Sequence, residues 1–293
     1  MRPVTLGQLT IRKVFELESG PPMPLIMSGV TAADLARLAT WYRDETLGAT
    51  VEQSAFTMSM HSFVLQVDGL TVLVDACNGS HKQRSIPDVD RVETPFLANL
   101  AALDLTTDDI DLVLCTHLHF DHVGWNTRLE NGRWVPTFAN ARYLFSRRDF
   151  EHFGAQEIED DHLRAFRDSV LPVYDAGRAE LVDTNVSVHR EIGNGVWLEP
   201  ALGHSPGNFS VLAERGGERA IFWGDVVHHP VQLIRPELLM SFDADQEAGR
   251  DTRSRTLARA VDEGLVCFPA HFRDPSAGRV LRDGQAYRYL FLD

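Results

Sequence analysis

Hydrophobic and polar residues alternate along several segments of the chain, which is the pattern of strands with one buried face. Residues 9–17 (LTIRKVFEL) alternate in this way. Residues 61–77 hold two β-branched runs on either side of Asp68-Gly69, a dipeptide that favours a tight hairpin turn. Residues 111–115 predict a short buried strand, because an apolar run follows a polar turn there. Four further apolar runs follow between residues 179 and 229, and each ends in a polar or glycine-containing loop.

Other segments have the spacing of helices. Residues 31–46 begin with Thr31 and place apolar residues three positions apart, and residues 250–264 form another amphipathic run before the apolar segment LVCF. Residues 94–103 predict a short helix, with Thr94 as its cap and Pro95 at its first position. We therefore expect one domain over residues 1–293, a β-rich sandwich flanked by helices.

Two segments stand apart from this pattern. The first 50 residues are expected to form an N-terminal extension, because the motifs described below lie after them. Residues 147–175 are charged and aromatic with helical spacing, and predict one or two helices outside the sheets. These helices could cover a functional site or present an ordinary solvated face, and His152 and His162 within them are expected to be exposed.

Composition narrows the classes of partner. The 293 residues are 44% hydrophobic and 24% charged, with a formal net charge of −14. Such an acidic chain repels phosphate backbones and anionic lipid surfaces, so we expect neither nucleic acid nor membrane as a partner, but a small molecule. No apolar stretch approaches the length of a membrane span, and the three cysteines form no disulfide pattern. A cytoplasmic location is the expectation that fits best.

The segment LCTHLHFDHVGW, residues 114–125, carries the clearest chemistry. His117, His119, Asp121 and His122 follow directly on the predicted buried strand, at the position where α/β proteins place functional side chains. Imidazole and carboxylate groups are ligands for zinc and similar divalent ions. Four such groups would lack partners if they were buried without a metal, so the motif favours a metal site over a solvated loop.

Three more loops repeat this placement. His204 lies in GHSPGN, Asp225 in WGDVVHH and His271 in PAHF, and each loop follows an apolar run. Together these motifs resemble the metallo-β-lactamase superfamily over roughly residues 60 to 275, in the order of that family. The resemblance implies an α/β fold (α+β), an αβ/βα sandwich of two mixed β-sheets with helices on the outer faces.

The resemblance also implies a ligand set. His117, His119 and His204 would hold a first metal ion, Asp121, His122 and His271 a second, and Asp225 would bridge them. Asp75, at the end of the run LTVLVDA, matches an aspartate that supports the site through a ligand. Two divalent ions are thus expected; zinc is the default, and manganese, iron or cobalt would fit the same ligands. Family habit further suggests a homodimer formed through the first 50 residues.

The activity implied is hydrolysis, with a metal-bridging hydroxide attacking the carbonyl of a lactone or ester. Asp121 is expected to be catalytic as a proton shuttle, although a purely ligating role is equally consistent with the sequence. The β-lactam-hydrolysing members generally lack the bridging aspartate, so Asp225 favours other hydrolases. The alternatives are hydrolysis of another bond, in a phosphotriester, an amide or an activated aryl halide, and a metal-binding sensor without turnover.

The motifs are most similar to the acyl-homoserine-lactonase-like branch, which includes quorum-quenching enzymes, but two positions depart from it. Those lactonases have a tyrosine three residues after the bridging aspartate, where this chain has His228 followed by His229. His228 is the expected catalytic hydrogen-bond donor and His229 a neighbour that supports the site, or both are bystanders at its rim. Asn208 replaces the last histidine of the HSPGH pattern. Phe120 and Trp125 lie within residues 114–125, the segment that we call the metal loop, and are the expected substrate contacts.

Overall fold

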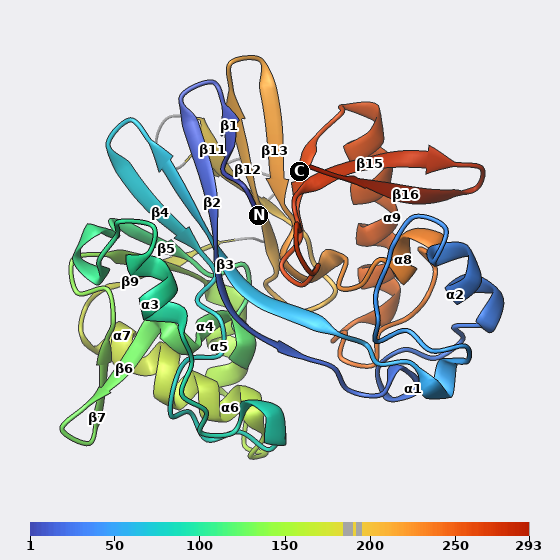
Figure 1. Ribbon diagram of the computed structural model, residues 1–293. Coiled ribbons are helices and arrows are strands. Elements are labelled where there is room, and N and C mark those ends of the chain that lie inside the picture. Colours follow the sequence, from blue (N-terminus) through green and yellow to red (C-terminus); the bar gives the residue numbers. More distant parts are fainter. Residues whose placement is uncertain (184–189, 192–194, 293) are drawn as a thin grey trace.

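Two seven-stranded sheets pack face to face (Figure 1), and we describe them from a computed structural model that covers residues 1–183, 190–191 and 195–292. The first sheet has the order β1-β2-β3-β4-β5-β8-β9, antiparallel from β1 to β4 and parallel from β4 to β9. Its strands are β1 (Val4–Leu6), β2 (Leu9–Ser19), β3 (Met58–Val67), β4 (Leu70–Val74), β5 (Leu112–Leu114), β8 (Arg142–Ser146) and β9 (Ala179–Val182).

The second sheet runs in sequence order from β10 to β16, and is antiparallel except for the parallel pair β13–β14. A separate hairpin, β6 (Thr127–Glu130) and β7 (Arg133–Pro136), follows the metal loop. The second sheet comprises β10 (Arg190–Glu191), β11 (Val196–Pro200), β12 (Phe209–Arg215), β13 (Glu218–Phe222), β14 (Val266–Phe268), β15 (Gly278–Asp283) and β16 (Ala286–Phe291).

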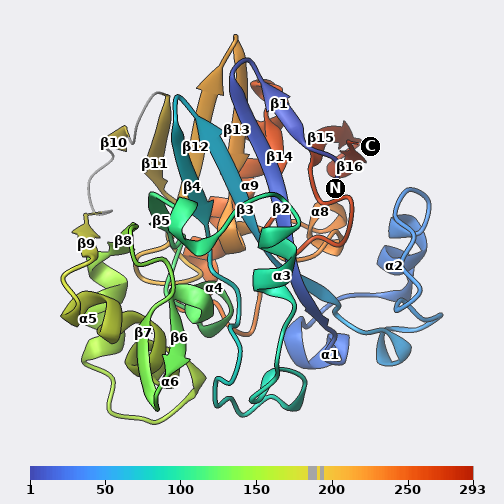
Figure 2. The same cartoon turned by 60° about the vertical axis from the view of Figure 1, so that its left-hand side comes forward.

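The alternation of side chains along the strands divides the core into layers. Phe63 and Leu65 of β3 pack between the sheets against residues such as Phe222 of β13, whereas Val64 packs on the outer face of the first sheet. Helices α3 to α7 lie on the side of the first sheet, and α9 packs on the outer face of the second (Figures 1 and 2). This confirms the sandwich with helices outside.

The helices are short except for α9, and among the described residues none is long and apolar enough to cross a membrane. Single helical turns lie at Val51–Gln53, Pro87–Val89, Thr107–Asp109, Gly124–Asn126 and Gly224–Val226, and a π-helical turn at Phe166–Val170 joins α6 to α7. The helices are α1 (Met23–Ile26), α2 (Ala32–Leu38), α3 (Phe96–Ala101), α4 (Phe120–Val123), α5 (Arg147–Gly154), α6 (Asp161–Ala165), α7 (Leu171–Asp175), α8 (Val231–Ile234) and α9 (Gln246–Asp262).

Part of the expected N-terminal extension belongs to the first sheet, because residues 4–6 and 9–19 form β1 and β2. Strand β2 pairs with β3 from Thr10–Gln66 to Ser19–Met58, with a register shift between Phe15 and Leu17. Thr94 does not cap α3: Pro95 precedes its first residue, and the Thr94 hydroxyl donates to Glu16 instead. The hairpin at Asp68-Gly69 is confirmed, with both residues at positive φ (49° and 82°).

Candidate metal centre

The ligand-type residues gather because the strands that carry them end at the same side of the sandwich. Asp75 follows β4, and the segment from His117 follows β5, its parallel neighbour. In the second sheet, Asp225 follows β13 and His271 follows the parallel strand β14. The carboxyl ends of parallel strands lie at one edge of a sheet, which places these loops together.

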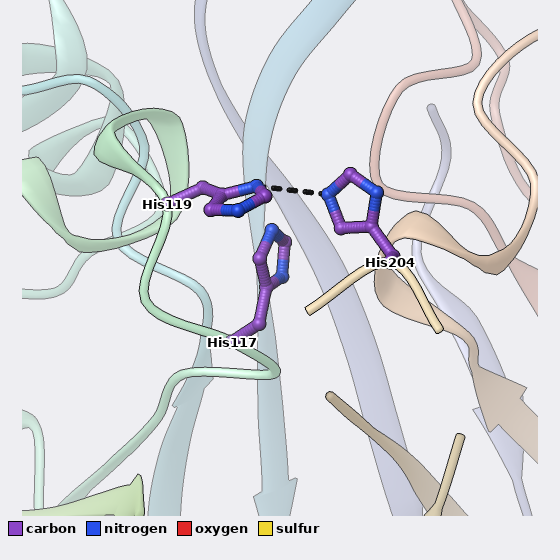
Figure 3. A group of neighbouring side chains, drawn as sticks. All are labelled: His117, His119 and His204. Carbon is purple, nitrogen blue, oxygen red and sulfur yellow. Dashed lines mark hydrogen bonds between the residues drawn. The ribbon is translucent and has the colours of Figure 1, made fainter. Parts of the chain in front are cut away.

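A first group comprises His117, His119 and His204, whose nearest ligand atoms all lie within 4.8 Å of one another (Figure 3). Nε2 of His204 lies 2.9 Å from Nδ1 of His119. The ring of His117 stands nearly perpendicular to both of the others, at interplanar angles of 79° and 86°. Three imidazoles that converge in this way match the donor set of a divalent transition-metal site.

A second group comprises Asp121, His122 and His271, again within 4.8 Å. Nε2 of His122 lies 3.2 Å from Nε2 of His271, and Oδ2 of Asp121 lies 3.5 Å from the latter atom. Asp121 and His122 are neighbours in α4, a single helical turn within the metal loop.

Asp225 lies between the two groups. Its Oδ2 atom is 3.1 Å from Nε2 of His204 and 3.8 Å from Nε2 of His117. Its Oδ1 atom is 3.2 Å from Nε2 of His122 and 3.0 Å from Nε2 of His271. One carboxylate thus presents one oxygen to each group, which is the arrangement expected of a bridging ligand.

The histidines of the centre differ in their electrostatics: despite burial, the charge of Asp225 raises the pKa of His122, of His204 and of His271, whereas two others shift the opposite way. Burial, followed by the charge of neighbouring histidines, lowers the pKa of His117 and of His119 well below the usual value, which keeps both imidazoles in the neutral, ligating form. Burial alone would raise the pKa of Asp225, but the surrounding histidines, His271 and His122 foremost, hold that pKa well below its usual range. Nε2 of His117 is buried without a hydrogen-bond partner among the residues that the structure describes. A buried imidazole nitrogen without a partner, beside a carboxylate surrounded by imidazoles, fits a divalent-metal site better than a metal-free cluster.

Two aspartates orient the ligand rings. Oδ2 of Asp75 lies 3.0 Å from Nδ1 of His122, while its Oδ1 accepts a 2.7 Å hydrogen bond from the backbone N–H of Thr116. This is the supporting position expected for Asp75. Asp243, which the sequence analysis missed, lies 2.9 Å from Nδ1 of His204 through Oδ1. In both cases the carboxylate turns the other ring nitrogen toward the centre.

Close packing against the backbone of Asn78 fixes the position of the metal loop. A Cβ atom at Gly124 would lie 1.7 Å from the carbonyl oxygen of Asn78, so only glycine fits there. Asp149 of α5, buried and also missed from the sequence, accepts hydrogen bonds from the Ser205 hydroxyl (2.8 Å) and the Gly207 N–H (2.6 Å). It thereby ties the loop that carries His204 to the helical segment 147–175.

A cavity of about 450 Å³ opens beside both groups, and His119, Asp121, His204, Asp225 and His271 contribute to its lining. Among the described residues that line it, none is Lys or Arg, and Asp160 and Asp161 add further carboxylates. Most of its walls are apolar, with side chains from α1, β3, the loop that follows β4 and the segment after α8: Leu25, Ile26, Met58, Ile86, Phe120 and Phe242.

The amino-acid sequence agrees with this geometry. A model of the metallo-beta-lactamase superfamily matches residues 59–271. The chain belongs to that superfamily. A probable metallo-hydrolase of Mycobacterium tuberculosis and one of Mycobacterium bovis are each 25% identical over 195 residues, which cover 62% of this chain. The match spans 60% of the length of these curated relatives.

Solved structures of the superfamily share the whole fold. A hydrolase named AbOPH superposes with a TM-score of 0.80 at 21% identity, covering 99% of this chain and 97% of that one. AidC, described as a dizinc quorum-quenching lactonase in complex with a product, gives a TM-score of 0.80 at 16% identity, covering 100% and 97%. These similarities confirm the expected metallo-β-lactamase fold, and the hydrolase relatives support a metal-dependent hydrolase.

Of the remaining predicted residues, some line the cavity and others pack elsewhere in the fold. Phe120 and His228 line the cavity of this superfamily member. Trp125 does not: its ring stacks on Phe96, and its indole N–H donates to Glu16 at 2.6 Å. Trp125 is anchored by packing on the outer face of the first sheet, away from the lining of this cavity, and its role as a substrate contact stays a prediction.

His229 also lies elsewhere than expected. Its ring packs on Phe56 with centroids 5.0 Å apart and edge-on to Tyr42, within an apolar cluster, and Nδ1 accepts from the Val231 N–H. It therefore supports the fold behind His228 and does not contact the ligands. His162, expected to be exposed, instead lines the cavity and packs on His119 with ring centroids 4.0 Å apart, whereas His152 is exposed as expected.

Proposed function

We propose that this protein is a dinuclear metal-dependent hydrolase that opens a lactone or cleaves an ester in an uncharged small molecule with an apolar portion. The observation that carries the proposal is the position of Asp225, which presents one oxygen to each histidine group at the wall of an apolar cavity without lysine or arginine among its described lining. Two divalent ions in such a centre supply an activated water and polarise the scissile carbonyl.

The residues of the chain would handle the proton. Water adds to the carbonyl carbon, the bond to the leaving oxygen breaks, and that oxygen must gain a proton. The carboxylate of Asp121 is the group placed for this transfer, because it lines the cavity, keeps 11% of its side chain exposed and lies 3.5 Å from His271.

The cavity favours one charge class of substrate. Asp160 and Asp161 line it together with Asp121, and the described lining includes no cationic side chain. Asp161 is already paired with Arg164 at 2.9 Å, and the divalent ions would add positive charge at the centre, so these carboxylates alone do not exclude an anionic group. The preference for an uncharged substrate therefore rests on the apolar walls of the cavity. Apolar walls suit an acyl or aryl portion, which gains by leaving water.

A second candidate is hydrolysis of another bond in a neutral molecule, such as a phosphotriester, an amide or an activated aryl halide. One observation favours it: His228, not tyrosine, lies 3.1 Å from Asp225 at the position where the similar lactonases orient their substrate. A sensor that binds metal and ligand without turnover is the third candidate.

The test is a panel of neutral substrates given to the zinc-reconstituted protein: acyl-homoserine lactones, γ-lactones, aryl esters and a phosphotriester. We expect metal-dependent lactone or ester cleavage with kcat/KM on the order of 10⁴ M⁻¹s⁻¹. Asp121→Ala should abolish it, whereas Asp251→Asn, an exposed position on α9, serves as the matched control. Phosphotriester cleavage without ester cleavage would favour the second candidate. Metal binding without turnover of any substrate would favour the sensor.

A further inference from the structure

His228 lies as close to the bridging carboxylate as a metal ligand does. Its Nε2 atom is 3.1 Å from Oδ2 of Asp225, the same separation as that between Nε2 of His204 and this oxygen. His117, the third of these neighbours, is farther away at 3.8 Å. Oδ2 of Asp225 is therefore surrounded by three imidazole nitrogens, of which the superfamily pattern assigns only two to the metal.

The surroundings of His228 leave both ring nitrogens available. The side chain is 2% exposed, and neither Nδ1 nor Nε2 makes a well-aligned hydrogen bond within the described part of the chain. Its backbone N–H donates to Oε1 of Gln232 at 2.7 Å, which fixes the backbone position from which the side chain extends. The ring lies 4.8 Å from that of His204, centroid to centroid. Apart from its 3.1 Å approach to Asp225, the buried imidazole has no hydrogen-bond partner among the described residues, and a bound ion would engage it.

The spacing is that of two ligands on one ion. Bonds from zinc to nitrogen and oxygen are about 2.0–2.2 Å long, so two donors at right angles lie roughly 3 Å apart. The 3.1 Å between Nε2 of His228 and Oδ2 of Asp225 matches this value, as does the 3.1 Å from His204. His228 shares a compact group with His204 and Asp243, in which ligand atoms lie within 4.8 Å, so His204 is the residue that links it to the group of His117 and His119. Asp243 already holds Nδ1 of His204, which leaves Nε2 of that ring for the centre.

We propose that His228 is an additional ligand of the first metal ion, beside His117, His119, His204 and Asp225. The inference rests on the metal-dependent function proposed above, but concerns metal binding and not the substrate. The role proposed for His228 is thus metal coordination, in place of the hydrogen-bond donation that the sequence suggested. The two sites then differ in kind, because the first has five protein donors and the second has four. An open position for a substrate oxygen would accordingly belong to the second site.

Nuclear magnetic resonance of the cadmium-loaded protein, labelled at its histidine nitrogens, tests this without relying on turnover. We expect scalar coupling between cadmium and Nε2 of His228, in a signal assigned by its loss in His228→Gln. His162→Gln, which alters a histidine of the same cavity outside the ligand groups, should remove no coupled signal. An uncoupled His228 whose Nε2 carries a proton would overturn the proposal.

Cobalt substitution gives a second, independent readout. The visible d–d absorption of Co²⁺ strengthens as its coordination number falls. His228→Gln keeps a hydrogen-bond donor but removes the imidazole, so it should strengthen this absorption. A loss of affinity of about 10–100-fold without a spectral change would instead indicate a residue that only supports the ligands, and would overturn the proposal. An unchanged spectrum and affinity in the folded variant would count against ligation. Lactone turnover is measured separately, so failure of this inference leaves the proposed hydrolase untouched.

Discussion

Asp243 places a carboxylate oxygen 2.9 Å from Nδ1 of His204 and so determines which nitrogen of that ring faces the metal centre. Asp75 does the same for His122 from the other sheet, at 3.0 Å. The two aspartates are unrelated in sequence position, yet each fixes one ligand of a different metal group. Metal binding should therefore respond to both, but at different sites.

Asp243→Asn is expected to weaken metal binding at the first site by about tenfold, because the ring of His204 loses a charged acceptor that raises its basicity. Asp75→Asn should have a similar effect at the second site. Competition with a chelator, followed in two phases, measures both affinities. If each variant weakened both sites equally, the separate roles would be contradicted. Asp251→Asn on the exposed face of α9 controls for a general effect of charge.

Phe120 and Trp125 should separate substrate binding from stability. Phe120→Ala removes part of the cavity wall and is expected to raise KM for apolar substrates by about tenfold, equivalent to about 1.4 kcal/mol. Trp125→Phe removes the donor to Glu16 and should lower the free energy of unfolding by about 1–3 kcal/mol, with KM unchanged. Steady-state kinetics and urea unfolding of both variants provide the test. The reverse assignment would show that Trp125 reaches the substrate.

Asp168 should be a determinant of stability, because it pairs with two buried basic side chains. It accepts 2.8 and 3.2 Å hydrogen bonds from Arg84 and lies 3.6 Å from Nζ of Lys82, and both basic side chains are fully buried. Asp168→Ala removes the carboxylate that pairs with Arg84, whereas Lys82 keeps its hydrogen bond to the Thr127 hydroxyl, and we expect a loss of about 3–5 kcal/mol in the free energy of unfolding. Denaturant titration measures it, with the exposed Asp175→Ala as control. A loss below about 1 kcal/mol would mean that water reaches the two cations.

Glu16 should make stability depend on pH. Burial raises its pKa from 4.5 to about 7, although Asn78, Thr94, Trp125 and Gly79 all donate to the carboxylate. Between these values the folded protein retains a proton that the unfolded chain has released. The free energy of unfolding should therefore fall as pH rises from about 4.5 to about 7, by on the order of 3 kcal/mol, and then level off.

The measurement is the difference in unfolding free energy between the wild type and Glu16→Gln, taken at pH 5 and at pH 8. The histidines of the metal centre titrate in both proteins and cancel in this difference. We expect the wild type to lose its advantage over the variant at the higher pH. A difference that does not change with pH would place the Glu16 pKa near its ordinary value in the fold.

The layers, and the grouping of the candidate ligands, could be predicted from the sequence because both are encoded locally. Alternation along β3 separates Phe63 from Val64, and His117, His119, Asp121 and His122 lie within a single loop. Each remaining ligand follows a strand that can be recognised by its apolar run. The same logic extends to residues 147–175, whose helical spacing was confirmed by α5, α6 and α7.

The supporting residues escaped prediction because their partners are distant in sequence. Asp243 meets His204 across 39 residues, and Asp149 meets Ser205 across 56, in segments with no motif of their own. The position of Trp125 outside the cavity lining was not predicted, for a related reason. Its position in the metal loop suggested the cavity, but its partner Glu16 lies 109 residues away and turns the indole into the core. A single sequence contains no local pattern that identifies pairs of residues so distant from each other.

Both ligand groups draw on the two layers at once: the loop after β5 supplies His117, His119, Asp121 and His122, and the second sheet supplies His204, Asp225 and His271. Bound ions would therefore act as cross-links through the sandwich, and metal occupancy would add to folding stability by mass action. A half-assembled chain offers neither site complete. Metal uptake would thus be a late event in the maturation of the protein, and scarcity of metal would shorten its lifetime as well as limit its activity.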